Sequence, residues 1–219
     1  MKSFASLASL LPVLALALPG LASAQIADPA NDWWTAVTAS GNKPYDGAHS
    51  GDMDVLNAFG LYDASLQSFT LVATMNGAIG ASANAHYIWG VNTGAGTAGF
   101  ATSGLNGVLF NKVFNITPGA AGTATVAGAT ASYVGSTLIL VVPLGSLPAS
   151  ANGFTPGDFT WNLWSRDFTA GLAQPIGDFA PDNANMAIAT VGAVPEPGSM
   201  ALMMMGGAGL LAWRRRKAS

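Results

Sequence analysis

The chain has 219 residues, of which 50% are hydrophobic and only 9% are charged, a mixture that excludes an intrinsically disordered protein. Residues 25–194 hold ten Asp, no Glu and three basic residues, a net charge of −7 with His neutral, and phosphate binding needs clustered Lys and Arg, so no nucleic-acid partner is expected. The chain has no cysteine, which excludes disulfides, thiolate metal sites and a Cys nucleophile.

The first predicted element is a signal peptide over residues 1–24. It has one positive charge at Lys2 and then an apolar stretch over about residues 4–18. Small residues, Ala22 and Ala24, stand at the −3 and −1 positions of a signal peptidase site. A retained anchor helix is the alternative, which two prolines, a glycine and the short apolar stretch disfavour. We therefore expect a signal helix that signal peptidase removes after Ala24 during export through the inner membrane.

The central region, residues 25–193, shows almost no helix periodicity. Short alternating or apolar runs bounded by Gly, Asn, Asp and Pro recur about every ten to fifteen residues, which is typical of strands and turns. So many short strands in one domain predict an all-β fold, an antiparallel β-sandwich of jelly-roll or immunoglobulin-like kind. The predicted strands are 33–39, 54–62, 66–76, 86–92, 108–116, 123–127, 137–142, 158–166 and 185–191.

Three segments within this region have a distinctive composition. The run LILVVPL from Leu138 predicts a strand that is covered on both faces and ends at Pro143. The Gly-rich segments NTGAGTAGF from Asn92 and AGTATVAGATAS from Ala121 predict hairpin turns and loops. No helix pattern follows the first of them, so it is not a phosphate-binding loop.

Carboxylates in the predicted loops offer a candidate calcium site. Ca²⁺ takes six to eight oxygen ligands, which the loops of a β-sandwich can supply from Asp, Asn and backbone carbonyls. Asp52 and Asp54 are the first candidates because they stand close together. Other residues that could join them are Asp28, Asp32, Asp46, Asp178, Asp182 and Asn183. The EF-hand spacing is missing, ordinary turn formation by Asp is the alternative, and no other cofactor is expected.

Catalytic patterns are weak in this sequence. There is no G-x-S-x-G elbow, and a Ser-His site or a zinc site would have to use His49, Ser50 or His86, which lack the required spacing. A pair of Asp could do glycosidase chemistry, but nothing in the sequence selects one whose pKa would be raised. We expect no enzyme activity, and a secreted hydrolase is the least favoured alternative.

An aromatic strand is the candidate glycan site. In DFTWNLWSR, strand alternation places Phe159, Trp161 and Leu163 on one face, which we expect to be core. The opposite face carries Thr160, Asn162, Trp164 and Arg166. A ring beside polar groups is typical of a surface that stacks on a sugar and binds its hydroxyls, although Trp is also often half-buried in a sandwich.

The layout of the central region resembles the DOMON-like or carbohydrate-binding-module type of sandwich found in secreted proteins. The resemblance rests on the order and spacing of segments and carries no catalytic residues. It implies a glycan-binding role as an alternative function. The segments that carry it are DPANDWW from Asp28, SGDMDVLNAFGLYD from Ser50, HYIWGVNTG from His86, FTWNLWSRD from Phe159 and GDFAPDNANMAI from Gly177.

The last predicted element is a C-terminal tail in three parts. Pro195, Glu196 and Pro197 cannot continue a helix, so they should form an extended segment just outside the membrane. The apolar run at residues 199–213 would form a transmembrane helix of about 22 Å against a hydrocarbon core near 30 Å, which it barely spans. The basic tail at 214–217 should stay cytoplasmic by the positive-inside rule.

This tail, residues 194–219, resembles the PEP-CTERM sorting signal of Gram-negative bacteria. The resemblance implies that exosortase, a membrane-embedded transpeptidase-like protease, recognises Pro195, Glu196 and Pro197 and cuts nearby. It also implies an association with exopolysaccharide and biofilm production. The alternative is a simple tail anchor, which would hold the domain at the inner membrane, facing the periplasm.

These elements predict an exported, non-catalytic protein of the cell surface or extracellular matrix. Its domains would be a signal peptide (1–24), a β-sandwich (25–193) and a sorting signal (194–219). Two alternatives remain open, a carbohydrate-binding module with a defined site and a secreted hydrolase.

Overall fold

The computed structural model describes residues 25–191. The predicted signal peptide with Ala22 and Ala24, the Pro195-Glu196-Pro197 motif, and the predicted C-terminal helix and basic tail therefore lie outside the described residues. Within residues 25–191, no helix has both the length and the apolar character that a membrane crossing requires.

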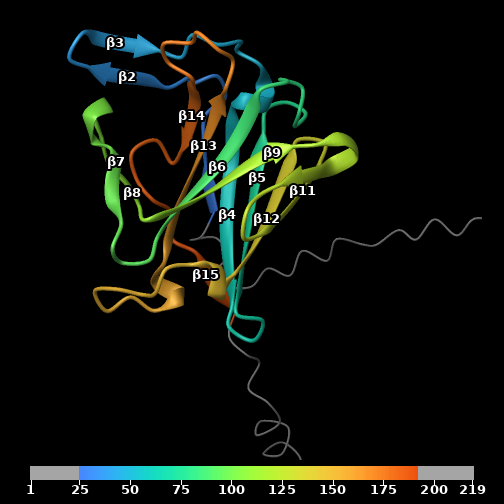
Figure 1. The fold of residues 1–219 in the computed structure, drawn as a ribbon, viewed down its shortest axis with the longest axis vertical. Coiled ribbons are helices and arrows are strands. Elements are labelled where there is room, and N and C mark those ends of the chain that lie inside the picture. Colours follow the sequence, from blue (N-terminus) through green and yellow to red (C-terminus); the bar gives the residue numbers. More distant parts are fainter. Residues whose placement is uncertain (1–24, 192–219) are drawn as a thin grey trace, which may run out of the picture.

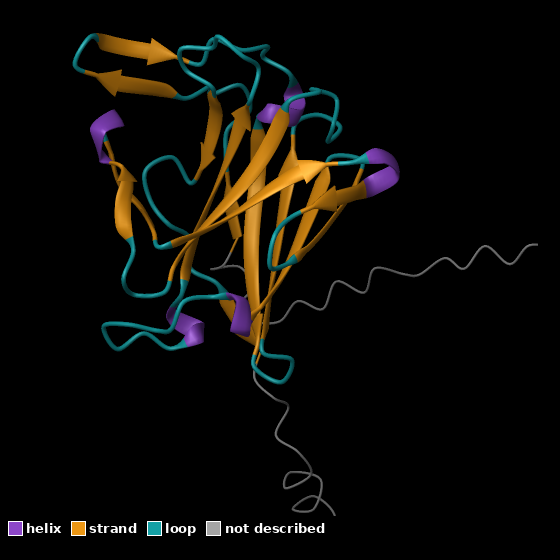
Figure 2. Cartoon of the chain, viewed as in Figure 1, coloured by secondary structure: helices purple, strands orange, loops and turns teal. Residues whose placement is uncertain are grey.

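The described chain consists of strands joined by loops and by single turns of 3₁₀ helix (Figure 1, Figure 2). The strands are β1 (Gln25–Ala27), β2 (Thr35–Thr38), β3 (Gly41–Pro44), β4 (Val55–Asp63), β5 (Ser68–Met75), β6 (Ala85–Asn92), β7 (Thr97–Phe100), β8 (Leu105–Phe110), β9 (Lys112–Pro118), β10 (Thr123–Thr125), β11 (Thr130–Val134), β12 (Thr137–Pro143), β13 (Thr160–Asp167), β14 (Ile176–Ala180) and β15 (Ala189–Val191). The 3₁₀ turns are η2 (Gly51–Met53), η3 (Ala101–Ser103), η4 (Ala120–Gly122), η5 (Leu144–Ser146) and η6 (Pro156–Asp158).

Most strands belong to one 11-stranded sheet that folds back on itself. Its order is β1-β4-β5-β12-β11-β10-β9-β6-β13-β14, and β15 also pairs with β4. Figure 1 shows β6 and β9 slanting across β4 and β5. The two halves meet again where β14 contacts β4, and there the Val55 amide donates a hydrogen bond to Asp178 (2.7 Å). The pairs β2-β3 and β7-β8 form two small separate sheets.

The predicted all-β antiparallel sandwich is confirmed. All strand pairs are antiparallel except β15 with β4. The prediction of one strand over residues 108–116 is wrong, because the chain breaks at Asn111 into β8 and β9. The first Gly-rich segment, predicted as hairpin turns and loops, also contains strand β7. In the second, β10 lies within the predicted strand at 123–127, and the unpredicted β11 begins near the end of the segment.

Two apolar clusters lie on opposite sides of β13. Trp161 packs in the main core, between β4, β5 and β12 on one side and β6 and β9 on the other. Trp164 packs in a second cluster with Trp34, Val108 and Phe179, under the β7-β8 hairpin. Strand β13 is therefore covered on both faces.

Strand β12 behaves differently from its prediction. Its burial alternates, with Leu138, Leu140 and Val142 fully buried but Ile139 and Val141 only partly buried. The expectation of a strand covered on both faces is wrong for this strand. It describes β14, whose five residues are all buried.

Candidate metal centre

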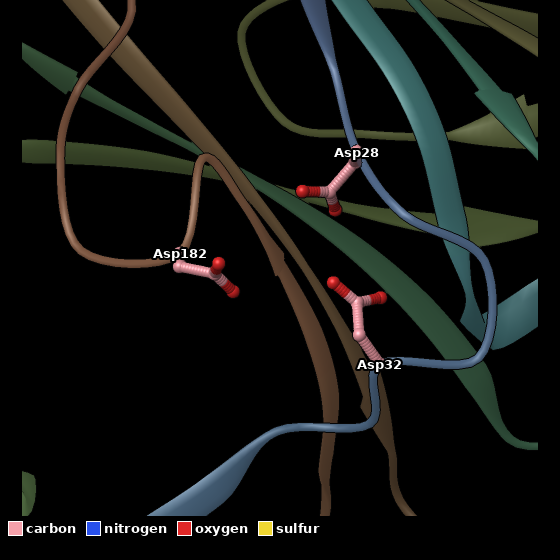
Figure 3. A group of neighbouring side chains, drawn as sticks. All are labelled: Asp28, Asp32 and Asp182. Carbon is pink, nitrogen blue, oxygen red and sulfur yellow. The ribbon is translucent and has the colours of Figure 1, made fainter.

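Five aspartates from three distant parts of the chain lie together where β4 meets β14. Asp28, Asp32 and Asp182 each place a carboxylate oxygen within 4.8 Å of the others, and Asp32, Asp54 and Asp178 do the same. Asp32 is common to both groups. Figure 3 shows Asp28 and Asp32, from the segment after β1, and Asp182, from the loop after β14, with their carboxylates turned toward a shared space.

The segment after β1 is held in place by backbone contacts. The amide of Asp28 donates to the Leu56 carbonyl of β4 (2.9 Å), and the amide of Trp34 donates to the Gly177 carbonyl of β14 (2.9 Å). Between them, Asn31 adopts a left-handed conformation (φ 64°), which Asn tolerates better than most residues. This turn directs both Asp28 and Asp32 into the cluster.

Asp54 and Asp178 form the inner side of the cluster, and each is only 1% exposed. Asp54 Oδ2 accepts hydrogen bonds from the Asn31 amide (2.9 Å) and from Asn76 Nδ2 (2.8 Å). Asp178 accepts hydrogen bonds from the amides of Val55 and Phe179, both at 2.7 Å. These donors fix the two inner carboxylates but supply no full positive charge.

The loop that carries Asp182 is fastened by asparagine side chains. Asn162 Nδ2 of β13 donates to the carbonyls of Pro181 (2.6 Å) and Ala184 (2.7 Å). Asn183 Oδ1 accepts a hydrogen bond from the Gly107 amide of β8 (2.8 Å). Asp182 is therefore exposed on a loop that is tied to the sheet on both sides of it.

The electrostatics of the cluster show that its charge is poorly compensated. Burial raises the pKa of Asp28 to about 7, and the negative charges of Asp32, Asp182 and Asp54 add to the rise. Burial also raises the pKa of Asp178 to about 9 and lifts that of Asp32 above its ordinary value. Oδ2 of Asp28 and Oδ1 of Asp32 are shielded from solvent and accept no hydrogen bond. Neutralising the negative charge of the cluster requires either bound protons or a bound cation.

The two predicted calcium ligands separate in the structure. Asp54 joins the cluster, but Asp52 is directed away from it by the η2 turn. Asp52 Oδ2 accepts from the Ser82 amide (2.8 Å), Oδ1 accepts from Ser82 Oγ (2.7 Å), and the Tyr87 hydroxyl lies 3.4 Å from Oδ2. This fully buried side chain thus fastens η2 to the segment that leads into β6. Four of the other predicted calcium ligands lie in the cluster with Asp54: Asp28, Asp32, Asp178 and Asp182. Asp46 does not, because it accepts hydrogen bonds from the amides of Ala173 and Gln174.

The face of β13 predicted to bind glycan is buried, so the expectation that it forms an exposed surface is wrong. Asn162 is fully buried and Trp164 is 4% exposed. The Trp164 ring contacts Phe100, Phe110 and Phe179, so neither of its faces is free for a sugar. Arg166 is partly buried, with its guanidinium 4.9 Å from the centre of the Phe168 ring.

The histidines of the described region are engaged with other groups. His49 stacks on the Trp33 ring (4.5 Å between centroids), and His86 Nδ1 lies 2.9 Å from Asn115 Oδ1. A pocket of about 360 Å³ lies at the junction of β8 and β9, where Phe110, Asn111, Lys112 and Val113 line it. The acidic cluster lies elsewhere.

The comparisons with known proteins identify the C-terminal tail. The family model described as the PEP-CTERM protein-sorting motif matches residues 193–217. This confirms the prediction that the chain is an exported protein sorted by exosortase. No curated protein and no solved structure matches the chain, so the resemblance of the central domain to a DOMON-like sandwich stays a prediction.

Proposed function

We propose that the chain is a non-catalytic component of the bacterial cell surface or extracellular matrix, which exosortase releases from an inner-membrane intermediate. The match of the sorting motif to residues 193–217, directly after the last strand of a β-sandwich, carries this proposal. The sandwich is the part that would remain outside the cell after signal peptidase has cut behind Ala24 and exosortase has cut near Pro195.

A structural rather than catalytic role is supported by the side chains that chemistry would need. The rings of His49 and His86 contact aromatic or amide groups, and neither is paired with a carboxylate in the described region. The pocket at the β8-β9 junction has neither a histidine nor a carboxylate in its lining. We infer an accessory role in association with exopolysaccharide, in which the folded domain itself is the component displayed at the cell surface.

Intact mass of the protein recovered from each fraction of its native host tests the sorting step. We expect a chain that begins at Gln25 and ends near Pro195 in the surface or medium fraction. Replacing Pro195, Glu196 and Pro197 by Ala should leave a chain that runs to Ser219 in the inner-membrane fraction. Val194→Ala is the matched control and should be processed normally. Wild-type protein that keeps Ser219 in a host with active exosortase contradicts the proposal.

A second measurement separates the structural role from its alternatives. Retardation of the purified protein on gels of matrix polysaccharide would favour a carbohydrate-binding module over a purely structural component. Turnover of a glycan or ester substrate, abolished by a single Asp→Asn change, would instead show an enzyme. The proposal expects no turnover of any substrate in such a panel.

A further inference from the structure

The acidic cluster concentrates negative charge without a protein cation beside it. The neighbouring charges that act on Asp28 are those of other aspartates. The described region contains only three lysines and arginines, and the guanidinium of Arg166 lies over the Phe168 ring. Because Asp54 and Asp178 are almost fully buried, water cannot screen their charges as it does at the surface.

Two oxygens of the cluster point independently to a ligand. Asp28 and Asp32 are partly buried, and Oδ2 of Asp28 and Oδ1 of Asp32 are shielded from solvent without a hydrogen-bond partner in the described region. The one neighbouring carboxyl group that could share a proton with Asp28 is that of Asp178. A buried carboxylate oxygen without a partner is costly, and native proteins usually satisfy such atoms with a hydrogen bond, a water molecule or an ion. Both carboxylates are turned toward the space that they share with Asp182 (Figure 3).

The chemistry of the site selects the kind of ion. All side-chain ligand atoms of the cluster are carboxylate oxygens, which suit hard cations. The cluster contains no imidazole or thiolate that would favour zinc or copper. Oxygens bound to one Ca²⁺ at about 2.3–2.6 Å can lie up to about 5 Å apart, so three carboxylate oxygens that all lie within 4.8 Å of one another are close enough to bind the same ion. Mg²⁺ binds at about 2.0–2.1 Å in a strict octahedron, which a site spread over two loops meets less well.

We propose that Asp28, Asp32 and Asp182 bind a Ca²⁺ ion, that Asp54 and Asp178 supply further negative charge behind Asp32, and that the ion clips the segment after β1 to the loop after β14. The remaining ligands are water and backbone carbonyls, because three carboxylates fill only part of the coordination sphere. An exported domain meets calcium outside the cell, and sites of extracellular modules have dissociation constants of about 10⁻⁴–10⁻³ M. The ion therefore binds after export and, outside the cell, holds the segment after β1 against the loop after β14.

Calorimetric titration of the chelator-treated protein, purified from its host, with CaCl₂ tests the site directly. We expect saturable binding of one Ca²⁺ per chain with a dissociation constant of about 10⁻⁴–10⁻³ M. At a calcium concentration near 100 times that constant, the unfolding temperature should rise by about 5–10 °C. MgCl₂ at the same concentration, and NaCl at the same ionic strength, should give much smaller shifts. Binding does not depend on where the protein is sorted, so this test and the processing test fail separately.

Variants distinguish a bound ion from a purely structural cluster. Asp182→Asn changes an exposed residue and should reduce calcium affinity at least tenfold. In chelator the same variant should be as stable as the wild type or more so, because it removes a repelling charge. Asp28→Asn should act in the same way. Asp63→Asn, in the distant β4-β5 turn, is the matched control and should keep the full calcium response.

Three outcomes overturn the proposal. One is the absence of any saturable calcium binding up to 10 mM, about ten times the upper expected constant. Another is an equal rise in unfolding temperature with Mg²⁺ or with matched NaCl, which shows charge screening. The third is an undiminished calcium response in both Asp182→Asn and Asp28→Asn.

Discussion

Trp164 shows how a residue that suggests a binding surface can be part of the core. It is 4% exposed and packs against Phe100, Phe110 and Phe179, whereas Phe168, four residues later, is 48% exposed. Trp164→Ala should therefore lower the free energy of unfolding by about 3–5 kcal/mol, the usual cost of a large cavity.

The matched variant Phe168→Ala removes an exposed ring that contacts Arg166 and His86, and it should cost about 1 kcal/mol or less. Urea unfolding of both variants checks the contrast. A small effect at Trp164 together with weakened binding to a matrix polysaccharide would restore the glycan-binding interpretation.

At the scale of single elements, apolar alternation in the sequence predicts which face of a strand joins the main core, but it does not show what covers the opposite face. Alternation in 158–166 correctly places Phe159, Trp161 and Leu163 in the core, since each is at most 1% exposed. It could not reveal that the β7-β8 hairpin covers the opposite face, because that cover comes from a distant part of the chain. Strand β14 escaped prediction since its five buried residues lack a period of two.

The break between β8 and β9 and the acidic cluster have the same kind of cause. Asn111 leaves the strand direction to exchange hydrogen bonds with Thr93, a partner eighteen positions away that no local pattern marks. Asp52 and Asp54 are separated by one residue in the sequence, but Asp52 lies within the η2 turn and contacts Ser82, whereas Asp54 follows the turn and joins the cluster. The composition of the loops could identify these carboxylates as candidate ligands, but which of them lie together depends on how the sheet closes.

The contact between β8 and the loop after β14 leaves no room for one additional methyl group, so a glycine-to-alanine substitution tests it. A Cβ added at Gly107 would collide with the Asn183 backbone carbonyl, whereas one added at Gly145 would meet nothing within 4 Å. Gly107→Ala should cost about 1–3 kcal/mol of unfolding free energy and weaken calcium binding by shifting Asp182.

Gly145→Ala should leave both quantities unchanged, and thermal unfolding with and without calcium compares the two variants. Equal behaviour of the variants would mean that the loop does not depend on its seat against β8.

For the molecule as a whole, the cluster joins the first and last parts of the described chain across the closure of the sheet. Removing calcium should therefore loosen the periphery rather than the centre. In chelator we expect faster amide hydrogen exchange over residues 28–34 and 178–186. Slow exchange should persist in β5 and β12, whose paired residues Leu71 and Leu140 are fully buried. Hydrogen exchange read by mass spectrometry with and without calcium checks this, and a uniform increase over the whole sheet would count against it.

Strand β4 carries both ends of the described chain on a single edge. Strand β1 pairs with Asn57 to Phe59 and β15 pairs with Leu61 to Asp63, while β5 occupies the opposite edge. An uncovered strand edge offers a row of amides and carbonyls to any second chain and so invites aggregation, which very short outer strands discourage. Strands β1 and β15, the described segments nearest to the proposed processing sites, thus cover this edge of β4, and a protein whose ends were detached would present β4 as a template for the next copy.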